Sequence, residues 1–400
     1  MTMKKKIAVF FGGRSPEHDV STYTGLQEVF KAVDQSQYDP FPVYIAPHGG
    51  WFIGHELLKK ENYIFSHEDE KKLTPVSLDL NAKGFGRLLP QSSKLFRKTK
   101  PIEFDIALPA FHGLFGEDGN FQGLMEFANI PYAGMRAKAC AVFMDKDSTK
   151  KAFEGSGIPI LPYATINRPE NGFMPDKNVV KDVLKKITLP CIVKPANLGS
   201  SIGVGKAETV DEVREILGNL FRYDTKAILE PFVENMIEYN VALRVNEKNE
   251  IETSAIERPR THEELLDFKE KYLSGGGKKN SSKQNIQGML AMTRDINPEL
   301  TPEQENNIRN WSVEIFSRYD PAGAPRIDFI GNQKTGEIWF NELNPIPGSY
   351  GYFLWEAAKN PILFVELING LLSEAEKHHK LKQVPHDPVP EDARLFDRPL

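Results

Sequence analysis

The chain has 400 residues, too many for one hydrophobic core, so we expect two or three domains. Apolar residues make up 40% and charged residues 26%, as in a globular protein, and no apolar run approaches the ~20 residues of a membrane span. A net charge of −5 argues against general binding to nucleic acids or membrane surfaces. Two cysteines provide no disulfide framework, so we expect a cytoplasmic protein.

The N-terminal stretch predicts the front of an α/β unit. Lys5–Phe11 is an apolar run typical of a buried strand, a glycine-containing turn follows, and Thr22–Val33 has the spacing of a helix. Ligands bind at the carboxyl ends of strands in such units, which places Glu17 beside an expected site. Helix capping is the alternative interpretation of Glu17.

A histidine follows a second predicted strand. Phe104–Ala110 has the composition of a strand, and the glycine-rich segment Phe111–Gly123 opens the next helix. His112 therefore stands at the carboxyl end of a strand, where a functional role and a structural role are both open.

The most informative stretch is Leu189–Ala207, LPCIVKPANLGSSIGVGKA. It predicts a strand, a loop of glycine and serine, and a returning strand. The loop N–H groups and hydroxyls can line an anion. The ammonium of Lys194 ends a buried strand and needs a partner, which a bound phosphate would supply. A plain hairpin is the alternative, and the loop matches neither the GxxxxGKS/T nor the GxGxxG pattern.

Three segments of the C-terminal half carry further signals. Ala227–Val233 predicts a strand that breaks at Pro231, where an open carbonyl suits a flat ring. Residues 262–287 are rich in glycine and lysine and predict a mobile lid, with a plain linker as the alternative. The segment from residue 373 holds several prolines and charges and predicts a disordered tail.

Four polar side chains lie on two neighbouring predicted strands. Arg326 and Asp328 share one face of the first strand, and Glu342 and Asn344 share one face of the second. Antiparallel pairing would bring the carboxylates together, although the sequence leaves the register open. Two carboxylates and an amide oxygen suit Mg²⁺ completed by phosphate oxygens and water. Charges on a solvated hairpin are the alternative.

Taken together, these segments resemble the D-alanine–D-alanine ligases of the ATP-grasp superfamily over about residues 4–370. The landmarks occur in the family's order: FGGRSPEHDVS, HGLFGEDGNFQG, MDKDSTK, VKPANLGSSIGV, LEPFVE, KYLS, RIDF and NELNPIPGS. The resemblance implies an α/β, three-lobed ATP-grasp fold with a Rossmann-like N-terminal lobe. The expected divisions are 1–140 (N-terminal lobe), 141–229 (central lobe), 230–372 (C-terminal lobe with lid 262–287) and 373–400 (disordered tail).

The resemblance also implies a reaction. ATP, with two Mg²⁺ or Mn²⁺ ions, would phosphorylate the carboxylate of a first D-alanine to an acyl phosphate. An amine would then attack and expel phosphate, which forms a dipeptide for cell-wall peptidoglycan synthesis. Positioning and charge stabilisation supply most of the catalysis in such phosphoryl transfers. Small amino acids are the expected substrates, nucleic acid and membrane are not expected partners, and a homodimer is expected by analogy.

Residue by residue, the match covers nucleotide, metal and substrate positions. The positions matching nucleotide contacts are Lys146, Lys194 and the lid residue Lys271 for the phosphates, Glu230 and Val233 for the adenine, and Glu238 for the ribose. The positions matching Mg²⁺ ligands are Asp328, Glu342 and Asn344. The positions matching groups around the reacting carboxyl are Glu17 for the first ammonium, Ser200 and Tyr272 linking Glu17 to the lid, His112 and Arg326 beside the carboxyl, and Gly348 as an oxyanion donor.

The chain departs from the family pattern beside the second substrate. Phe353 stands where the family has a serine that binds the second substrate's carboxylate, and a phenyl ring donates no hydrogen bond. Ser349, Tyr350 or Tyr352 could compensate for that serine. One alternative is therefore an ATP-grasp ligase with a different amine acceptor, and another is a degenerate nucleotide-binding module. The retained lysines and carboxylates argue against the second alternative.

Overall fold

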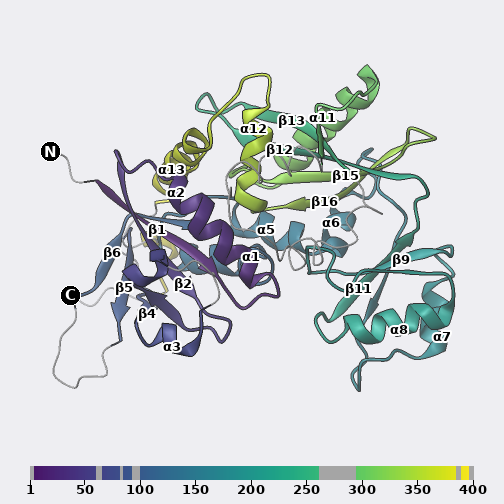
Figure 1. The fold of residues 1–400 in the computed structure, drawn as a ribbon, viewed down its shortest axis with the longest axis horizontal. Helices are drawn as coiled ribbons and strands as arrows, with labels where there is room; N and C mark the ends of the chain where they lie inside the picture. The colour runs from purple at the N-terminus through teal and green to yellow at the C-terminus, as the bar shows by residue number, and fades with distance from the viewer. Residues whose placement is uncertain are drawn as a thin grey trace, which may run out of the picture.

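The computed structural model describes residues 4–59, 65–81, 84–91, 100–260, 294–383 and 389–395. It contains three β-sheets with helices packed on them, and the sheet formed by the last strands of the chain lies between the other two (Figure 1). The predicted α/β, three-lobed fold class is therefore confirmed. A search of the described helices finds none with the length and apolarity needed to span a membrane.

The N-terminal lobe is built on a seven-stranded sheet of order β6-β5-β4-β3-β2-β1-β7. Its strands are β1 (Lys5–Gly12), β2 (Tyr38–Ile45), β3 (Trp51–Ile53), β4 (Thr74–Leu78), β5 (Gly86–Pro90), β6 (Ile102–Phe104) and β7 (Ile106–Pro109). Its helices are α1 (His18–Tyr23), η1 (Thr24–Val29), α2 (Phe30–Ala32), η2 (His55–Lys59), α3 (His67–Glu70) and α4 (Asn120–Phe127). β1 pairs in parallel with β2 and β7, and its continuous apolar run is buried on both faces, as expected for a parallel strand.

The central lobe is a four-stranded antiparallel sheet of order β10-β9-β11-β8, with two helices packed on it (Figure 1). Its elements are β8 (Ala164–Asn167), α7 (Lys177–Val183), β9 (Cys191–Pro195), β10 (Gly205–Ala207), α8 (Val210–Leu220) and β11 (Lys226–Pro231). The strand, loop and returning strand predicted within Leu189–Ala207 are β9, the connecting loop and β10, and this prediction is confirmed.

The C-terminal lobe is a five-stranded antiparallel sheet of order β14-β13-β12-β15-β16. Its strands are β12 (Met236–Val245), β13 (Ile251–Pro259), β14 (Arg294–Ile296), β15 (Arg326–Asn332) and β16 (Ile338–Asn344). The helices packed around it are α5 (Ala137–Met144), α6 (Lys146–Phe153), α11 (Pro302–Ser317), η3 (Gly348–Gly351), α12 (Tyr352–Glu356) and α13 (Phe364–Leu381), and η4 (Glu391–Ala393) lies near the end of the chain. One face of the sheet packs a core with α5, α6 and α11, in which Phe329 and Phe340 meet Phe153 and Phe316.

Two helices illustrate how the sequence determines where a helix begins and which face it buries. α11 begins at Thr301, whose hydroxyl accepts a hydrogen bond from the Gln304 N–H at 3.2 Å, with Pro302 in the first turn. α13 buries Leu367 and Leu371 at helical spacing in a core shared with β1 and β7, so it ties the N-terminal lobe to the C-terminal lobe.

The predicted disordered tail from residue 373 is wrong in its first part. α13 continues to Leu381, and Ala375 is buried, because its apolar stripe extends the core contact beyond the predicted limit. The predicted lobe boundaries at 140 and 229 stay predictions. We note that α5 and α6 pack on the five-stranded sheet although residues 141–153 were expected in the central lobe.

The C-terminal core predicts a large cost for removing Phe316, which is 0% exposed on α11. We expect Phe316→Ala to lower the stability by about 3–5 kcal/mol, because it leaves a cavity. Phe127→Ala on α4 is the control, since Phe127 is 75% exposed and should cost less than about 0.5 kcal/mol. Guanidinium unfolding followed by circular dichroism measures both variants, and equal midpoints would contradict the assignment of this core.

Candidate active site

Two adjoining cavities lie where the lobes meet. A cavity of about 380 Å³ is lined from all three lobes, and one of about 250 Å³ lies between the central sheet and the C-terminal sheet. They share Lys146, Ser200, Glu238 and Glu342 among their walls, so they form one continuous cleft.

All described residues of the predicted site line this cleft. The larger cavity is lined by Glu17, His112, Lys146, Ser200, Glu238, Arg326, Asp328, Glu342, Asn344 and Gly348. The smaller cavity adds Lys194, Glu230 and Val233. Lys271, Tyr272 and the predicted lid 262–287 lie outside the described residues.

The loop after β1 meets the loop after β9 through Glu17. The Ser200 hydroxyl donates a hydrogen bond to Glu17 Oε1. Burial raises the pKa of Glu17, and the Ser200 hydrogen bond and the Lys146 charge oppose that rise. Although Glu17 precedes α1, its side chain makes no capping hydrogen bond, so the capping interpretation is wrong. Ser200 has φ +50°, in the left-handed region that residues with side chains rarely adopt.

Two lysines flank one buried carboxylate beside the smaller cavity. Lys194 Nζ lies 2.6 Å from Glu230 Oε2 and donates to Asn341 Oδ1 at 3.0 Å, while Lys150 pairs with Glu230 Oε1. Burial would raise the pKa of Glu230, but the charges of Lys194 and Lys150 outweigh it and lower that pKa to about 2. The sequence analysis expected a phosphate as the partner of Lys194. In the structure, its partner is the carboxylate of Glu230 on the neighbouring strand β11.

Sequence reasoning missed Lys150. The signal was available, because Lys150 follows Lys146 by four residues on α6 and the two side chains share one face of that helix. Lys150 is only 1% exposed, and burial lowers its pKa.

Three carboxylates gather on the C-terminal sheet. Asp328 lies directly opposite Glu342 in the β15–β16 register, which settles the pairing that the sequence left open. Arg326 holds Asp328 with two hydrogen bonds of 2.7 Å, from Nε and Nη2. The Asn344 amide donates to Asp328 Oδ2 at 2.8 Å. Lys146 Nζ lies 3.1 Å from Glu342 Oε2.

The charges of this cluster favour a cation. Burial raises the pKa of Asp328, and the charge of Glu342 adds to this rise. The charge and hydrogen bonds of Arg326 oppose the rise but do not cancel it. Burial, followed by Asp328 and Glu342, also raises the pKa of Glu238 to about 7. Burial would raise the pKa of Glu342, but the charges of Lys146 and Lys194 outweigh it and lower that pKa. Asp328 and Glu238, whose ionisation is opposed by burial and by neighbouring carboxylates, fit a hard divalent cation.

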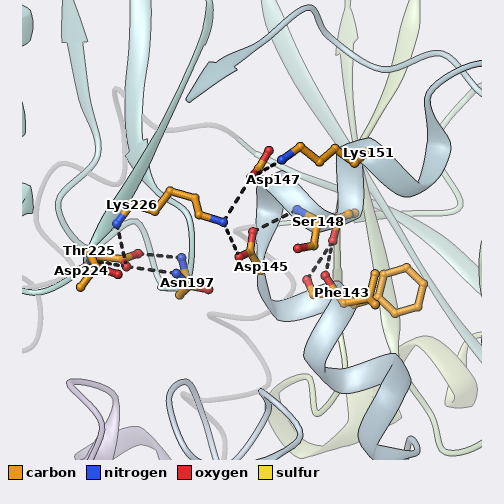
Figure 2. A network of polar contacts seen from close by, with 11 residues as sticks. Phe143, Asp145, Asp147, Ser148, Lys151, Asn197, Asp224, Thr225 and Lys226 are labelled. Carbon is orange, nitrogen blue, oxygen red and sulfur yellow. Dashed lines mark hydrogen bonds and ion pairs between the residues drawn. The ribbon is translucent and has the colours of Figure 1, made fainter. Parts of the chain in front are cut away.

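A turn beside the cleft is held by a polar network (Figure 2). Lys226 of β11 lies 2.9 Å from Asp145 Oδ2 and 3.1 Å from Asp147 Oδ2, on either side of Lys146. Asp224 accepts the backbone N–H of Asn197 at 2.7 Å and so holds the start of the loop that reaches Ser200. The network therefore holds the loop from Asn197 to Ser200 against the turn that carries Lys146.

His112 and Glu117 lie at the inner wall of the larger cavity. Burial lowers the pKa of His112 to about 4, so its ring is neutral near pH 7, and its Nε2 lies 3.0 Å from Thr24 Oγ1. Glu117, which the sequence analysis did not single out, accepts the N–H of Gly113 at 2.7 Å and that of Ile346 at 2.8 Å. Burial raises the pKa of Glu117 to about 8. This residue joins the His112 loop to the segment that leads into Gly348.

A second cluster of possible metal ligands lies outside the cleft. His48 Nε2 and His67 Nδ1 lie 3.2 and 3.3 Å from Glu70 Oε2 on the N-terminal lobe. The Gly50 N–H donates to His48 Nδ1 at 3.2 Å, which places the proton of the neutral ring on Nε2, the atom that faces Glu70. The hydrogen bond from Gly50 therefore opposes coordination of a cation through His48 Nε2.

Comparisons with known proteins cover nearly the whole chain. The family description "D-ala D-ala ligase N-terminus" matches residues 6–135, and "D-ala D-ala ligase C-terminus" matches residues 152–373. The chain is 33% identical to the D-alanine–D-alanine ligase of Thermosipho africanus over 394 residues, which are 98% of each protein.

Two solved structures share the fold and part of the sequence. The D-alanine–D-alanine ligase of Helicobacter pylori has a TM-score of 0.70 and 28% identity, covering 93% of this chain and 99% of that one. The VanG D-Ala:D-Ser ligase of Enterococcus faecalis has a TM-score of 0.69 and 26% identity, covering 93% and 100%. The similarity therefore includes all three lobes that line the cleft.

The Glu230 ion pairs predict a pH-dependent stability. Because the pKa of Glu230 is depressed in the folded state, its contribution is complete above its ordinary pKa of 4.5 and is lost as pH falls toward 2. We expect Glu230→Gln to cost about 3–5 kcal/mol near pH 7, since it leaves buried lysines unpaired. The difference from wild type should shrink below pH 4.5.

Thermal midpoints of both proteins at pH 7 and pH 3.5 measure this effect. Glu234→Gln is the control, because Glu234 follows the end of β11 and its side chain is exposed. A difference between wild type and Glu230→Gln that is constant across this pH range would contradict the ion-pair assignment.

Proposed function

The chain belongs to the D-alanine–D-alanine ligase family, ATP-dependent enzymes that form a dipeptide for cell-wall synthesis, and we propose that D-alanine is its substrate at both sites. The observation that carries the proposal is the convergence of Lys146 and Lys194 with Asp328 and Glu342 on one cleft. These residues come from distant parts of the chain, and their gathering on one cleft supports a site for a phosphorylated ligand and a cation.

The smaller cavity is the proposed site of ATP. Its walls combine the apolar residues Val233 and Ile330, which suit a flat base, with Lys146 and Lys194 for phosphate oxygens. The ammonium of Lys194 would exchange part of its contact with Glu230 for the phosphates. Glu238 lies between the two cavities and is the proposed ribose contact.

Asp328, Glu342 and Asn344 are the proposed ligands of two divalent cations. Bound Mg²⁺ neutralises charge on the transferring phosphoryl group. The two carboxylates offer hard oxygen donors on adjacent strands, and Asn344 offers an amide oxygen once its N–H group points to Asp328.

The larger cavity is the proposed site of the amino acids. Glu17 would accept the ammonium of the first D-alanine, with Ser200 holding the carboxylate in place. Arg326 and neutral His112 flank the position of the reacting carboxyl, and the Gly348 N–H is the proposed donor to the developing oxyanion. Excluding water would protect the acyl phosphate until the second amine attacks.

The alternative of a different amine acceptor is not favoured, because the relatives that match nearly the whole chain in sequence are named D-alanine–D-alanine ligases, although one structural neighbour, VanG, is a D-Ala:D-Ser ligase. Phe353 does not line either cavity, and its ring packs beneath the guanidinium of Arg294. Tyr350 cannot compensate for the missing serine hydroxyl as the chain stands, since its own hydroxyl donates to the carbonyl of Pro109. We propose that the second carboxylate is held by Arg326 and the backbone near Gly348.

Two further properties are proposed by analogy. A homodimer is the common state of related ligases, and we propose it for this chain. A cytoplasmic location is proposed because the chemistry uses ATP and because both cysteines, Cys140 and Cys191, are free thiols.

Purified protein with ATP, Mg²⁺ and D-alanine should release phosphate and yield a product with the mass of D-alanyl-D-alanine. We expect Lys194→Met to lower kcat by about 100-fold or more, because it removes a charge that faces the transferring phosphoryl group. Lys185→Met is the matched control on the same lobe, since Lys185 is exposed and pairs with Asp182. Chelation of divalent cations should stop the reaction.

Two outcomes would contradict the proposal. Phosphate release with another amino acid but not with D-alanine would overturn the assigned substrate. Equal kcat for Lys194→Met and Lys185→Met would overturn the assigned phosphate site.

A further inference from the structure

A row of polar side chains crosses the C-terminal sheet behind the cleft. Asn240 of β12 lies opposite Glu257 of β13 on one side and opposite Asp328 of β15 on the other. Asp328 in turn lies opposite Glu342 of β16. Directly opposite residues share one face of a sheet and lie within contact of each other, so these four side chains form one row.

The outer end of the row is an ion pair between a buried carboxylate and a partly exposed arginine. Arg294 of β14 lies 2.9 Å, through Nη1, from Glu257 Oε2, and its Cζ is 4.3 Å from the centroid of the Phe353 ring. Glu257 is 1% exposed, so its charge requires this partner. The aromatic residue at 353 thus packs against the guanidinium that pairs with the Glu257 carboxylate.

Glu257 fixes the orientation of the Asn240 amide. Asn240 Nδ2 donates to Glu257 Oε1 at 3.0 Å. An ionised carboxylate only accepts hydrogen bonds, so the amide cannot reverse without placing two acceptors together. Asn240 Oδ1 therefore points away from Glu257, toward the Asp328 side of the row.

That amide oxygen is buried without a donor. Asn240 is 4% exposed, and no described residue donates a hydrogen bond to Oδ1. A buried acceptor without a partner costs about 1–3 kcal/mol, so it marks a place where a donor is used in some state of the protein.

A donor on the same face of the sheet is Arg326, which lies opposite Ala242, two residues from Asn240 on β12. Arg326 lies two residues before Asp328 on β15, and its guanidinium is bound to both Asp328 oxygens by Nε and Nη2. Its charge interacts with Glu257 on the far side of Asn240. A guanidinium has five N–H groups, so Arg326 retains donors beyond those that Asp328 takes.

We propose that Asn240 is a positioning residue that receives Arg326. Its amide oxygen, aimed by the Glu257–Arg294 pair, is the acceptor toward which the guanidinium turns when Asp328 binds a divalent cation. Without this acceptor, and before a substrate carboxylate is bound, Arg326 would leave Asp328 with no hydrogen bond in exchange, and the cation would bind less tightly. The inference rests on the proposed cation site of this ligase.

The test is Mn²⁺ binding followed by electron paramagnetic resonance on the full chain, without turnover. We expect Asn240→Leu to weaken Mn²⁺ binding by about 10-fold, as for other groups that orient metal ligands. In an Arg326→Met background the same substitution should change the Mn²⁺ affinity less than about twofold, because Asp328 is then already free.

Asn369→Leu is the matched control. Asn369 on α13 also hydrogen-bonds a carboxylate, that of Asp34, and its Oδ1 is also buried without a donor among the described residues. It lies outside the cleft, so Mn²⁺ binding should equal that of wild type.

A double variant tests the inference even if Asn240→Leu misfolds. Asn240→Asp combined with Glu257→Gln keeps the hydrogen bond, the net charge and an oxygen facing Arg326, so Mn²⁺ should bind at least as tightly as in wild type. Wild-type affinity in Asn240→Leu, or an equal loss in the Arg326→Met background, would overturn the inference. Absence of Mn²⁺ binding by wild type would instead overturn the proposed cation site.

Discussion

The site depends on pairing buried lysines with carboxylates of other strands. Lys194 reaches Glu230 across the β9–β11 pair, and Lys146 reaches Glu342 on the C-terminal sheet. Removing such groups from water is costly unless each charge finds a partner with good geometry. The four side chains are therefore held in place by this electrostatic requirement, and a ligand that displaces one of these partners must offer an equivalent charge.

One face of the C-terminal sheet packs into the core, and the other face lines the cleft. Ile327 and Phe329 point into a core with α11, while Arg326 and Asp328 alternate with them and point into the cleft. One strand thus supplies both the packing that keeps it rigid and the groups that act. A rigid strand is a better support for a cation site than a loop, because its register fixes which carboxylates are opposite each other.

The cleft also explains why three lobes are needed. The larger cavity takes Glu17 and His112 from the N-terminal lobe, Ser200 from the central lobe, and Asp328 and Glu342 from the C-terminal lobe. α13 and the shared core around it join the first and last of these lobes. The hydrogen bond from Ser200 to Glu17 joins the central lobe to the N-terminal lobe. The lobes therefore meet through polar contacts in the cleft and through apolar contacts away from it.

The sequence by itself predicted the strand–loop–strand of Leu189–Ala207, because residue alternation and glycine loops are local properties. Its resemblance to the ligase family, carried by motifs in a fixed order, implied the fold class and the residues that line the cleft. Only the tertiary structure decided the partners. The register opposing Asp328 and Glu342, the Lys150–Glu230 pair and the link of Glu117 to Ile346 join residues distant in the sequence. The extent of α13 was likewise decided by a core on another lobe. Such contacts depend on burial, and burial exists only once the chain has folded.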